Sequence, residues 1–402
     1  MDFGFTEEQE KLRKEVTEFY LNELPSDFLP NVEAMSEEAQ SFFLQLQKKA
    51  GEKGYLTAGW PKEYGGMGLG EISQGIVNEV EGWWAFYKPN LIGLHLAGPG
   101  TIIFGTEEQK QWAIPPITRG EVVWFEAFTE PDAGSDEANQ QTRAVEDGDY
   151  FVVNGQKAFI SGGYKPDWLF TELRTADTIP KHRGLSLFLI PADLPGITYR
   201  PLPTMGFGPQ NEIFFDDVRV HKKYLLGELN KGFYHAMQVF EFERSGTNWP
   251  ADAKHRLMKL VQFCKEEKLN GRPLIEDPKV RDLLARIAIK VEVWRLVSWR
   301  TIWRIGERER LGPLDYDLTG FYHKACRTEF PQLMMGILGT YGQLRHGSKW
   351  AKLAGEIEYI WQLARSLHAG GTIEIYKIVL AQRGLGLPRQ ARAESAKSGG
   401  KE

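Results

Sequence analysis

The sequence predicts an α+β fold in which a central antiparallel β domain lies between two helical domains. Helical periodicity dominates the first third of the chain, clustered β-forming runs follow, and helical periodicity then returns and continues. The 402 residues suffice for two or three packed domains. We therefore expect domains at 1–120, 121–228 and 229–389, with a polar tail at 390–402.

The N-terminal third is expected to be helical. Thr6 and Gln9 have the spacing of a capping box, and apolar residues repeat at helical intervals behind them. The glycine-rich segment WPKEYGGMGLG (60–70) interrupts this pattern and indicates a turn or a loop that faces a ligand. Helical texture resumes over 71–105, and Thr106 marks a further helix start.

The middle of the chain carries short β-forming runs separated by Gly, Asp and Pro. These runs are VVWFEAF, YFVVNG, DWLFTEL, LSLFLI and EIFFDDVRV. Asp147–Gly148 lies between two of the expected strands and is typical of a hairpin turn. Such connections favour antiparallel pairing.

The last third should contain a long, deeply packed helix at 279–305. One face carries Val280, Leu283, Leu284, Ile287, Val291 and Trp294, and the other carries Ile289, Val293 and Leu296. Apolar residues on both faces predict burial on both sides.

Composition excludes several classes of protein. The net charge of -5 gives no basic surface for nucleic acid or for a membrane. No apolar run approaches the roughly 18 residues of a membrane span, and the acidic start resembles neither a secretory signal nor a transit peptide. Only two cysteines occur, Cys264 and Cys326, which argues against a disulfide scaffold. We expect a cytoplasmic protein.

The aromatic and glycine content is high, with 12 Trp, 14 Tyr, 23 Phe and 42 Gly. This suits a large flat cofactor and equally suits a large core. No GxGxxG follows an expected strand, and GxxxxGK[ST], GxSxG and HExxH do not occur. No metal site is expected, and His368, beside glycines, is more readily structural than chemical.

Six segments, taken together and in order, resemble the acyl-CoA dehydrogenase family. They are WPKEYGG (60–66), FTEPDAGSD (128–136), VNGQKAFIS (153–161), GELNKGF (227–233) with FER (242–244), AGGTIEI (369–375) and LGLPR (385–389). The resemblance spans roughly residues 3–389. It implies an N-terminal helical domain, a central β domain and a C-terminal four-helix domain.

The same resemblance implies FAD bound between subunits and oxidation of an acyl-CoA thioester to its 2-enoyl-CoA. An electron-transfer flavoprotein would accept the electrons. The chain looks similar to bacterial members that handle bulky or ring-containing acyl-CoAs, including steroid side chains. Some of these pair a base-bearing chain with a base-less one, so either a homotetramer or a heterotetramer with a related chain is implied.

The catalytic base departs from the commonest family pattern. Many members carry it as the Glu of a C-terminal EGT segment, where this chain has Gly370. Members similar to isovaleryl-CoA and long-chain dehydrogenases place it directly before an Arg on an earlier helix, which matches Glu243 and Arg244 here. Glu243 also continues the apolar stripe that ends at Phe240. We expect Glu243 to be the base, with an edge glutamate in a surface ion pair as the alternative.

The resemblance also assigns cofactor and substrate contacts. Phe128 and Thr129 would lie near the isoalloxazine, Ser135 near the pyrophosphate, Phe159 on the ring, Ser161 near N5, and Thr372 and Glu374 at the other end of the flavin. Substrate contacts would come from Ser135, Arg244 and Gly370. The Arg-x-x-Phe-Gly element of many relatives is missing from 268–278. Whether Arg272 replaces its arginine is left open.

Two other functions compete with a catalytic dehydrogenase. The chain could be a subunit that binds FAD or CoA without turnover, because Gly370 stands at the usual base position. It could also be an oxygen-using relative, an acyl-CoA oxidase or flavin monooxygenase, although the chain is shorter than typical oxidases of the family.

Overall fold

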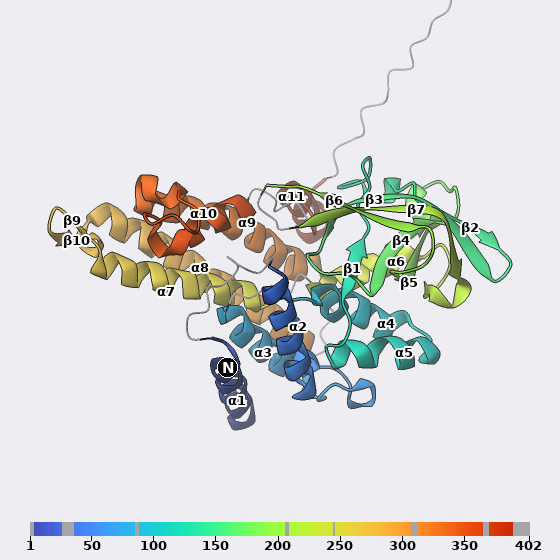
Figure 1. Cartoon of the computed structure of the whole chain (residues 1–402), viewed down its shortest axis with the longest axis horizontal. Helices are drawn as coiled ribbons and strands as arrows, with labels where there is room; N and C mark the ends of the chain where they lie inside the picture. Colours follow the sequence, from blue (N-terminus) through green and yellow to red (C-terminus); the bar gives the residue numbers. More distant parts are fainter. Residues whose placement is uncertain are drawn as a thin grey trace, which may run out of the picture.

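The computed structural model describes residues 4–25, 36–84, 88–205, 209–243, 246–306, 312–364 and 370–388. Two candidate residues, Arg244 and His368, and the tail at 390–402 lie outside the described residues. Helices occupy both ends of the chain, and a β domain lies between them (Figure 1). The α+β architecture is therefore confirmed.

The N-terminal helices begin where the sequence signals predict. They are α1 (Glu7–Glu23), α2 (Glu37–Glu52), α3 (Gly70–Trp84), α4 (Gly98–Phe104) and α5 (Glu107–Thr118). The capping box of Thr6 with Gln9 is present, and Thr106 forms a second one with Gln109. A π-helical turn, η3 (Gly93–Ala97), leads directly into α4.

The β domain is one eight-stranded sheet. Its strands are β1 (Trp124–Ala127), β2 (Arg143–Asp147), β3 (Tyr150–Ser161), β4 (Trp168–Arg174), β5 (Leu185–Pro191), β6 (Ile197–Leu202), β7 (Gln210–His221) and β8 (Leu225–Leu226). They follow the order β6-β7-β3-β2-β4-β5-β8, with β1 beside β4. Asp147 pairs with Tyr150, which confirms the hairpin. Most pairs are antiparallel, but β1 and β2 each run parallel to β4.

The C-terminal helices are α6 (Gly232–Glu243), α7 (Asn248–Glu266), α8 (Pro278–Gly306), α9 (Pro313–Leu338), α10 (Glu356–Leu363) and α11 (Ile373–Val379). A small hairpin of β9 (Lys268–Leu269) and β10 (Arg272–Pro273) joins α7 to α8. Cys264 and Cys326 are free thiols buried in the core of this domain. In the described part of the chain, no helix combines the length and the apolarity that crossing a membrane requires.

The prediction for α8 is half right. Val280, Leu284, Ile287, Val291 and Trp294 are buried against α7 and α9, as expected. The opposite face was also expected to be buried, and this is wrong for the single chain: Ile289 is 66% exposed and Leu296 54% exposed, with Val293 between them. The periodicity shows that both faces are apolar, but α7 and α9 cover only one of them.

Helix α6 is the link between the helical domains and the sheet. Ala236, Val239 and Phe240 share one core cluster with Phe170 of β4 and with Leu96 of η3. The C-terminal end of α6 is therefore held between the sheet and the N-terminal helices, and Glu243 is its last residue.

Candidate active site

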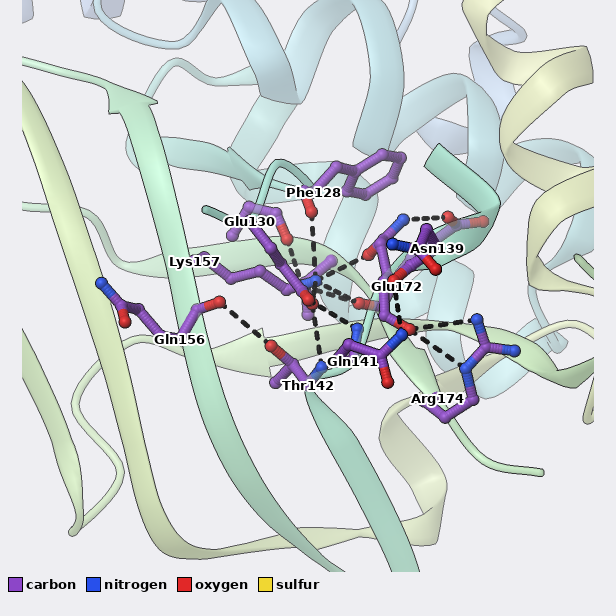
Figure 2. Close-up of polar contacts among 12 residues, drawn as sticks. Phe128, Glu130, Asn139, Gln141, Thr142, Gln156, Lys157, Glu172 and Arg174 are labelled. Atoms are coloured by element: carbon purple, nitrogen blue, oxygen red, sulfur yellow. Dashed lines mark hydrogen bonds and ion pairs between the residues drawn. The ribbon is translucent and has the colours of Figure 1, made fainter. Parts of the chain in front are cut away.

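A buried lysine organises the loop that follows β1. Lys157 points inward from β3, and its side chain is 0% exposed. Its Nζ donates to four oxygens: the Phe128 carbonyl at 3.1 Å, Glu130 Oε1 at 2.8 Å, Gln140 Oε1 at 2.6 Å and the Glu172 carbonyl at 2.8 Å (Figure 2). The ammonium therefore joins the start of the loop to its end and to β4.

The Glu130 carboxylate provides the negative charge that compensates the Lys157 ammonium. The carboxylate accepts the backbone N–H of Gln141 at 2.5 Å and of Thr142 at 2.9 Å, besides the contact with Lys157. Burial alone would raise the pKa of Glu130, but the Lys157 ammonium and these hydrogen bonds outweigh it, and the pKa is lowered. Glu130 and Lys157 therefore act as a charged, hydrogen-bonded pair inside the domain.

The floor of the loop is completed by β4. Glu172 Oε2 accepts from Gln140 Nε2 at 2.7 Å, and Arg174 donates to the carbonyls of Ala138 and Gln140 at 2.7 and 3.0 Å. Burial, and then the neighbouring Glu137 carboxyl, raise the pKa of Glu172 well above its usual range. Because these groups face inward, we assign them to the support of the loop and not to chemistry.

Phe159 stands out from the sheet on a β-bulge. The pairing of β3 with β7 shifts between Lys157 and Ile160, and Phe159 has a left-handed φ of 58° and is 53% exposed. The neighbouring Ala158 N–H donates to the Thr129 carbonyl at 2.9 Å, so Phe159 and Thr129 lie side by side. Ser161, at the end of β3, is half-buried beside Gln210.

The surface of this region fits a flavin dinucleotide. An exposed aromatic side chain on a fixed bulge offers a flat apolar contact for a ring system. Ser135 is exposed, and the space beside Gly134 is open for a close approach to the backbone. A hydroxyl next to an open stretch of backbone suits phosphate oxygens.

Changing Phe159 to Gly should separate its two roles. The left-handed backbone conformation costs a residue with a side chain about 1–2 kcal/mol, and glycine avoids this cost. We therefore expect the cofactor-free variant to unfold at the same or a higher denaturant concentration, while its affinity for FAD falls at least several-fold. Denaturant unfolding and FAD fluorescence titration measure the two effects. Equal affinity for FAD would remove Phe159 from the flavin site.

Phe128 is buried in the core, whereas Phe159 is exposed on the sheet. The Phe128 side chain packs on Phe170 at 5.5 Å and on Phe240 at 5.6 Å between ring centroids. Phe240 is three residues before Glu243, so these contacts bring the end of α6 to the loop that begins at Phe128. Two regions that are far apart in sequence thus meet at one place.

A cavity adjoins the end of α6. It has a volume of about 150 Å³, and Gly246, Trp60, Leu94 and Ile302 contribute to its walls. Glu71 and His95 also line it, and the sequence analysis named neither of them. A signal for Glu71 did exist: positions 71, 74 and 78 are polar and lie at helical spacing directly after the glycine-rich loop. His95 had no such signal.

The remaining candidates lie on the C-terminal domain. Thr372 caps α11 by accepting the Ile375 N–H at 3.3 Å, Glu374 is exposed, and the carbonyl of Gly370 accepts the Tyr376 hydroxyl at 2.8 Å. Tyr376 packs against Gly320 of α9, so α11 belongs to the helical bundle and not to the sheet that carries Phe159. Arg272 is exposed in β10, at the end of the molecule away from the β domain (Figure 1). Within one chain, Arg272 is therefore remote from Phe159.

Comparison with known proteins gives matches along almost the whole chain. Residues 6–121, 126–218 and 230–385 match the N-terminal, middle and C-terminal domains of the acyl-CoA dehydrogenase family. Acyl-CoA dehydrogenase FadE26 of Mycobacterium tuberculosis is 30% identical over 401 residues, which cover 98% of this chain and 100% of that protein.

Solved structures give the same result. A steroid acyl-CoA dehydrogenase described as Tcur3481-Tcur3483 superposes with a TM-score of 0.88 at 31% identity, over 97% of this chain and 100% of that chain. A chain of the ChsE4-ChsE5 complex from Mycobacterium tuberculosis superposes with a TM-score of 0.86 at 30% identity, over the same shares.

Proposed function

The chain belongs to the acyl-CoA dehydrogenase family, and from this premise we propose that it oxidises an acyl-CoA thioester to the 2-enoyl-CoA, with Glu243 as the base. It is an oxidoreductase of that family, and its cofactor is FAD. The observation that carries the assignment of the base is the contact of Phe128 with Phe240, which brings the end of α6 to the loop between β1 and β2, the proposed flavin loop (128–142).

The reaction removes two hydrogens from adjacent carbons. The Glu243 carboxylate takes the α-hydrogen as a proton, the β-hydrogen leaves as a hydride, and the electron pair of the α C–H bond forms the new C=C bond. Bound FAD would supply the oxidant that takes up this hydride. An apolar neighbourhood favours this role, because desolvation makes a carboxylate more basic. The cavity that Gly246 lines, three residues after Glu243, has Leu94 and Ile302 in its wall, which supports the proposal of an apolar reaction site.

The chain's own residues would hold FAD from two sides. We assign the ring to Phe159, Thr129 and Ser161, and the pyrophosphate to Ser135. Thr372 and Glu374 lie on the helical bundle and not on the sheet, so we propose that they serve a flavin whose ring is held by another chain. The same argument applies to Arg272 if it contacts FAD at all.

The exposed stripe on α8 supports assembly into an oligomer. Ile289, Val293 and Leu296 are apolar and exposed, whereas long apolar stripes are normally covered. Both solved relatives carry paired component names. We propose a homotetramer or a heterotetramer with a related chain, in which a neighbouring subunit covers this stripe. The second candidate function is that of a non-catalytic subunit, because Gly370 stands where many relatives carry the catalytic glutamate.

Charging this stripe should dissociate the assembly. We expect the double change Ile289→Lys and Leu296→Lys to lower the mass measured by analytical ultracentrifugation, with helical circular dichroism retained. Val145→Lys is a matched control, because Val145 is 54% exposed but lies on β2 in the β domain. An unchanged mass would show that the stripe lies outside the subunit interface.

Anaerobic titration with acyl-CoAs tests the proposed function. We expect straight, branched or cyclic thioesters to bleach the flavin absorbance and to produce a long-wavelength charge-transfer band. We propose an electron-transfer flavoprotein as the acceptor, so dye reduction should greatly exceed peroxide release in air. Comparable peroxide release would favour an oxidase, and a flavin that no thioester bleaches would favour the non-catalytic subunit.

A further inference from the structure

The cavity beside α6 is apolar on several sides but has a polar wall. Trp60, Leu94, Ile102 and Ile302 provide apolar surface, while Glu71, Gln74, Asn78 and His95 provide polar groups. Two ionisable side chains would be unfavourable in a pocket that binds only a hydrocarbon chain, because burying an unbonded polar group costs about 1–3 kcal/mol.

His95 is carried by the π-helical turn η3. The N–H of Gly98 bonds to the carbonyl of Gly93, a wider turn than that of an α-helix, and such turns are frequent at functional sites. Burial, with a smaller effect of the Lys88 charge, lowers the pKa of His95 to about 3, so the imidazole is neutral at any physiological pH. A neutral imidazole can both donate and accept a hydrogen bond.

Glu71 lies in the first turn of α3, half-buried in the same cavity. Burial raises the pKa of its carboxyl. Among the described residues, the side chains of Glu71 and His95 make no hydrogen bond or ion pair with one another or with any neighbour. Gln74 differs, because it accepts from the Gly59 N–H at 3.0 Å and donates to Asn78 at 3.2 Å. Glu71 and His95 therefore keep hydrogen-bonding capacity for a ligand.

The cavity lies beside the segment that follows the proposed base in the sequence. Gly246 lines it, three residues beyond Glu243, and Thr247 Oγ1 donates to the Gly75 carbonyl of α3 at 2.6 Å. Glu71 is four residues before Gly75, about 6 Å further along the helix axis. If the thioester lies at the end of α6, its acyl group can extend into the cavity that Gly246 and Glu71 both line.

The size of the cavity and the charged groups in its wall restrict the chemical class of its ligand. A cavity of about 150 Å³ is comparable to one that holds benzene in an engineered protein core, so one six-membered ring fits. Lys88 does not offer a free charge for an anion, because it pairs with Glu81, which also accepts the Tyr20 hydroxyl at 2.6 Å. A carboxylate ligand would therefore meet Glu71 without a free cation beside it. An uncharged hydroxyl group avoids this unfavourable contact.

We propose that the acyl group of the substrate is about one ring in size within this cavity and carries a hydroxyl group, which donates a hydrogen bond to Glu71 and accepts one from His95. This inference rests on the proposed function, since it treats the cavity as the acyl site. It makes Glu71 and His95 determinants of specificity and not catalytic residues.

Matched thioesters test the inference. Cyclohexanecarboxyl-CoA is compared with its 3- and 4-hydroxy and 3- and 4-oxo derivatives on the FAD-loaded protein. Dissociation constants come from calorimetry, and flavin bleaching is followed separately. We expect at least one hydroxy ester to bind about tenfold tighter than the plain ester, the effect of one or two well-formed hydrogen bonds.

Three variants locate the effect. Glu71→Leu and His95→Phe should each bring the preference for the hydroxy ester close to one, whereas Glu71→Gln should keep part of it. Glu108→Leu is the matched control, because Glu108 is exposed on α5 and does not line the cavity. This control should keep the full preference.

The two measurements separate the two claims. Tighter binding of a hydroxy ester, lost in Glu71→Leu, supports the inference even if no ester bleaches the flavin, a result that would overturn only the proposed dehydrogenation. Bleaching by the plain and both hydroxy esters with equal dissociation constants overturns the inference and leaves the proposed function intact. A preference that survives both Glu71→Leu and His95→Phe also overturns it.

Discussion

Replacing Glu243 by Gln is expected to slow flavin reduction by acyl-CoA about 10²–10⁴-fold, the usual contribution of a general base. Glutamine keeps the size of the side chain but cannot accept the α-proton. FAD content and the dissociation constant for the thioester should change little, because the variant loses a proton acceptor and not a binding group. Anaerobic stopped-flow absorbance gives the rate of the chemical step directly.

Two companion variants sharpen this test. Glu243→Asp keeps a carboxylate and should retain more activity than Glu243→Gln. Glu228→Gln is the matched control, since Glu228 is exposed in the segment before α6 and should leave the rate unchanged. If Glu243→Gln reduces its flavin within about twofold of the parent rate, another group is the base, and the proposal for Glu243 fails.

Replacing Lys157 by Met should lower the free energy of unfolding by about 3–5 kcal/mol, the cost of breaking a buried ion pair from one side. Methionine matches the length of lysine, but it leaves the Glu130 carboxylate buried without its cation and the carbonyls of Phe128 and Glu172 without their donor. We also expect lower FAD content, because the loop that starts at Phe128 loses its anchor. Denaturant unfolding and the flavin absorbance of purified protein measure the two losses.

The partner residue provides the decisive comparison. Adding Glu130→Gln to Lys157→Met should recover part of the lost stability, because the uncompensated charge is gone. Lys165→Met controls for the loss of a lysine as such, since Lys165 is exposed. A loss below about 1 kcal/mol in Lys157→Met would mean that the network contributes little to the fold.

Local signals in the sequence predicted local structure well. The capping box at Thr6 depends only on residues three apart, and the hairpin at Asp147 depends only on the turn itself, so both could be recognised without the fold. The exposed face around Ile289 could not, because periodicity identifies an apolar face but not the neighbour that covers it.

The site was predictable in part for a related reason. Short motifs that resemble known ones named Phe159 and its neighbours, although composition alone could not separate a flavin contact from a core aromatic. Lys157 lies in the same motif and passed unnoticed, because lysine is rarely fully buried. Glu71 of α3 and His95 of η3 come together only at the cavity that both line, which no local pattern encodes.

We expect the lysine network also to determine when the entropy of ordering the proposed flavin loop is lost. Because Lys157 and Glu130 hold both ends of the loop through contacts within the protein, the chain fixes this segment as it folds and not as the cofactor arrives. Capturing FAD then requires little further loss of conformational freedom, so more of the contact energy is available as affinity. Newly made protein would thus present a rigid receptor, and the speed of flavin loading would depend on encounter and not on loop closure.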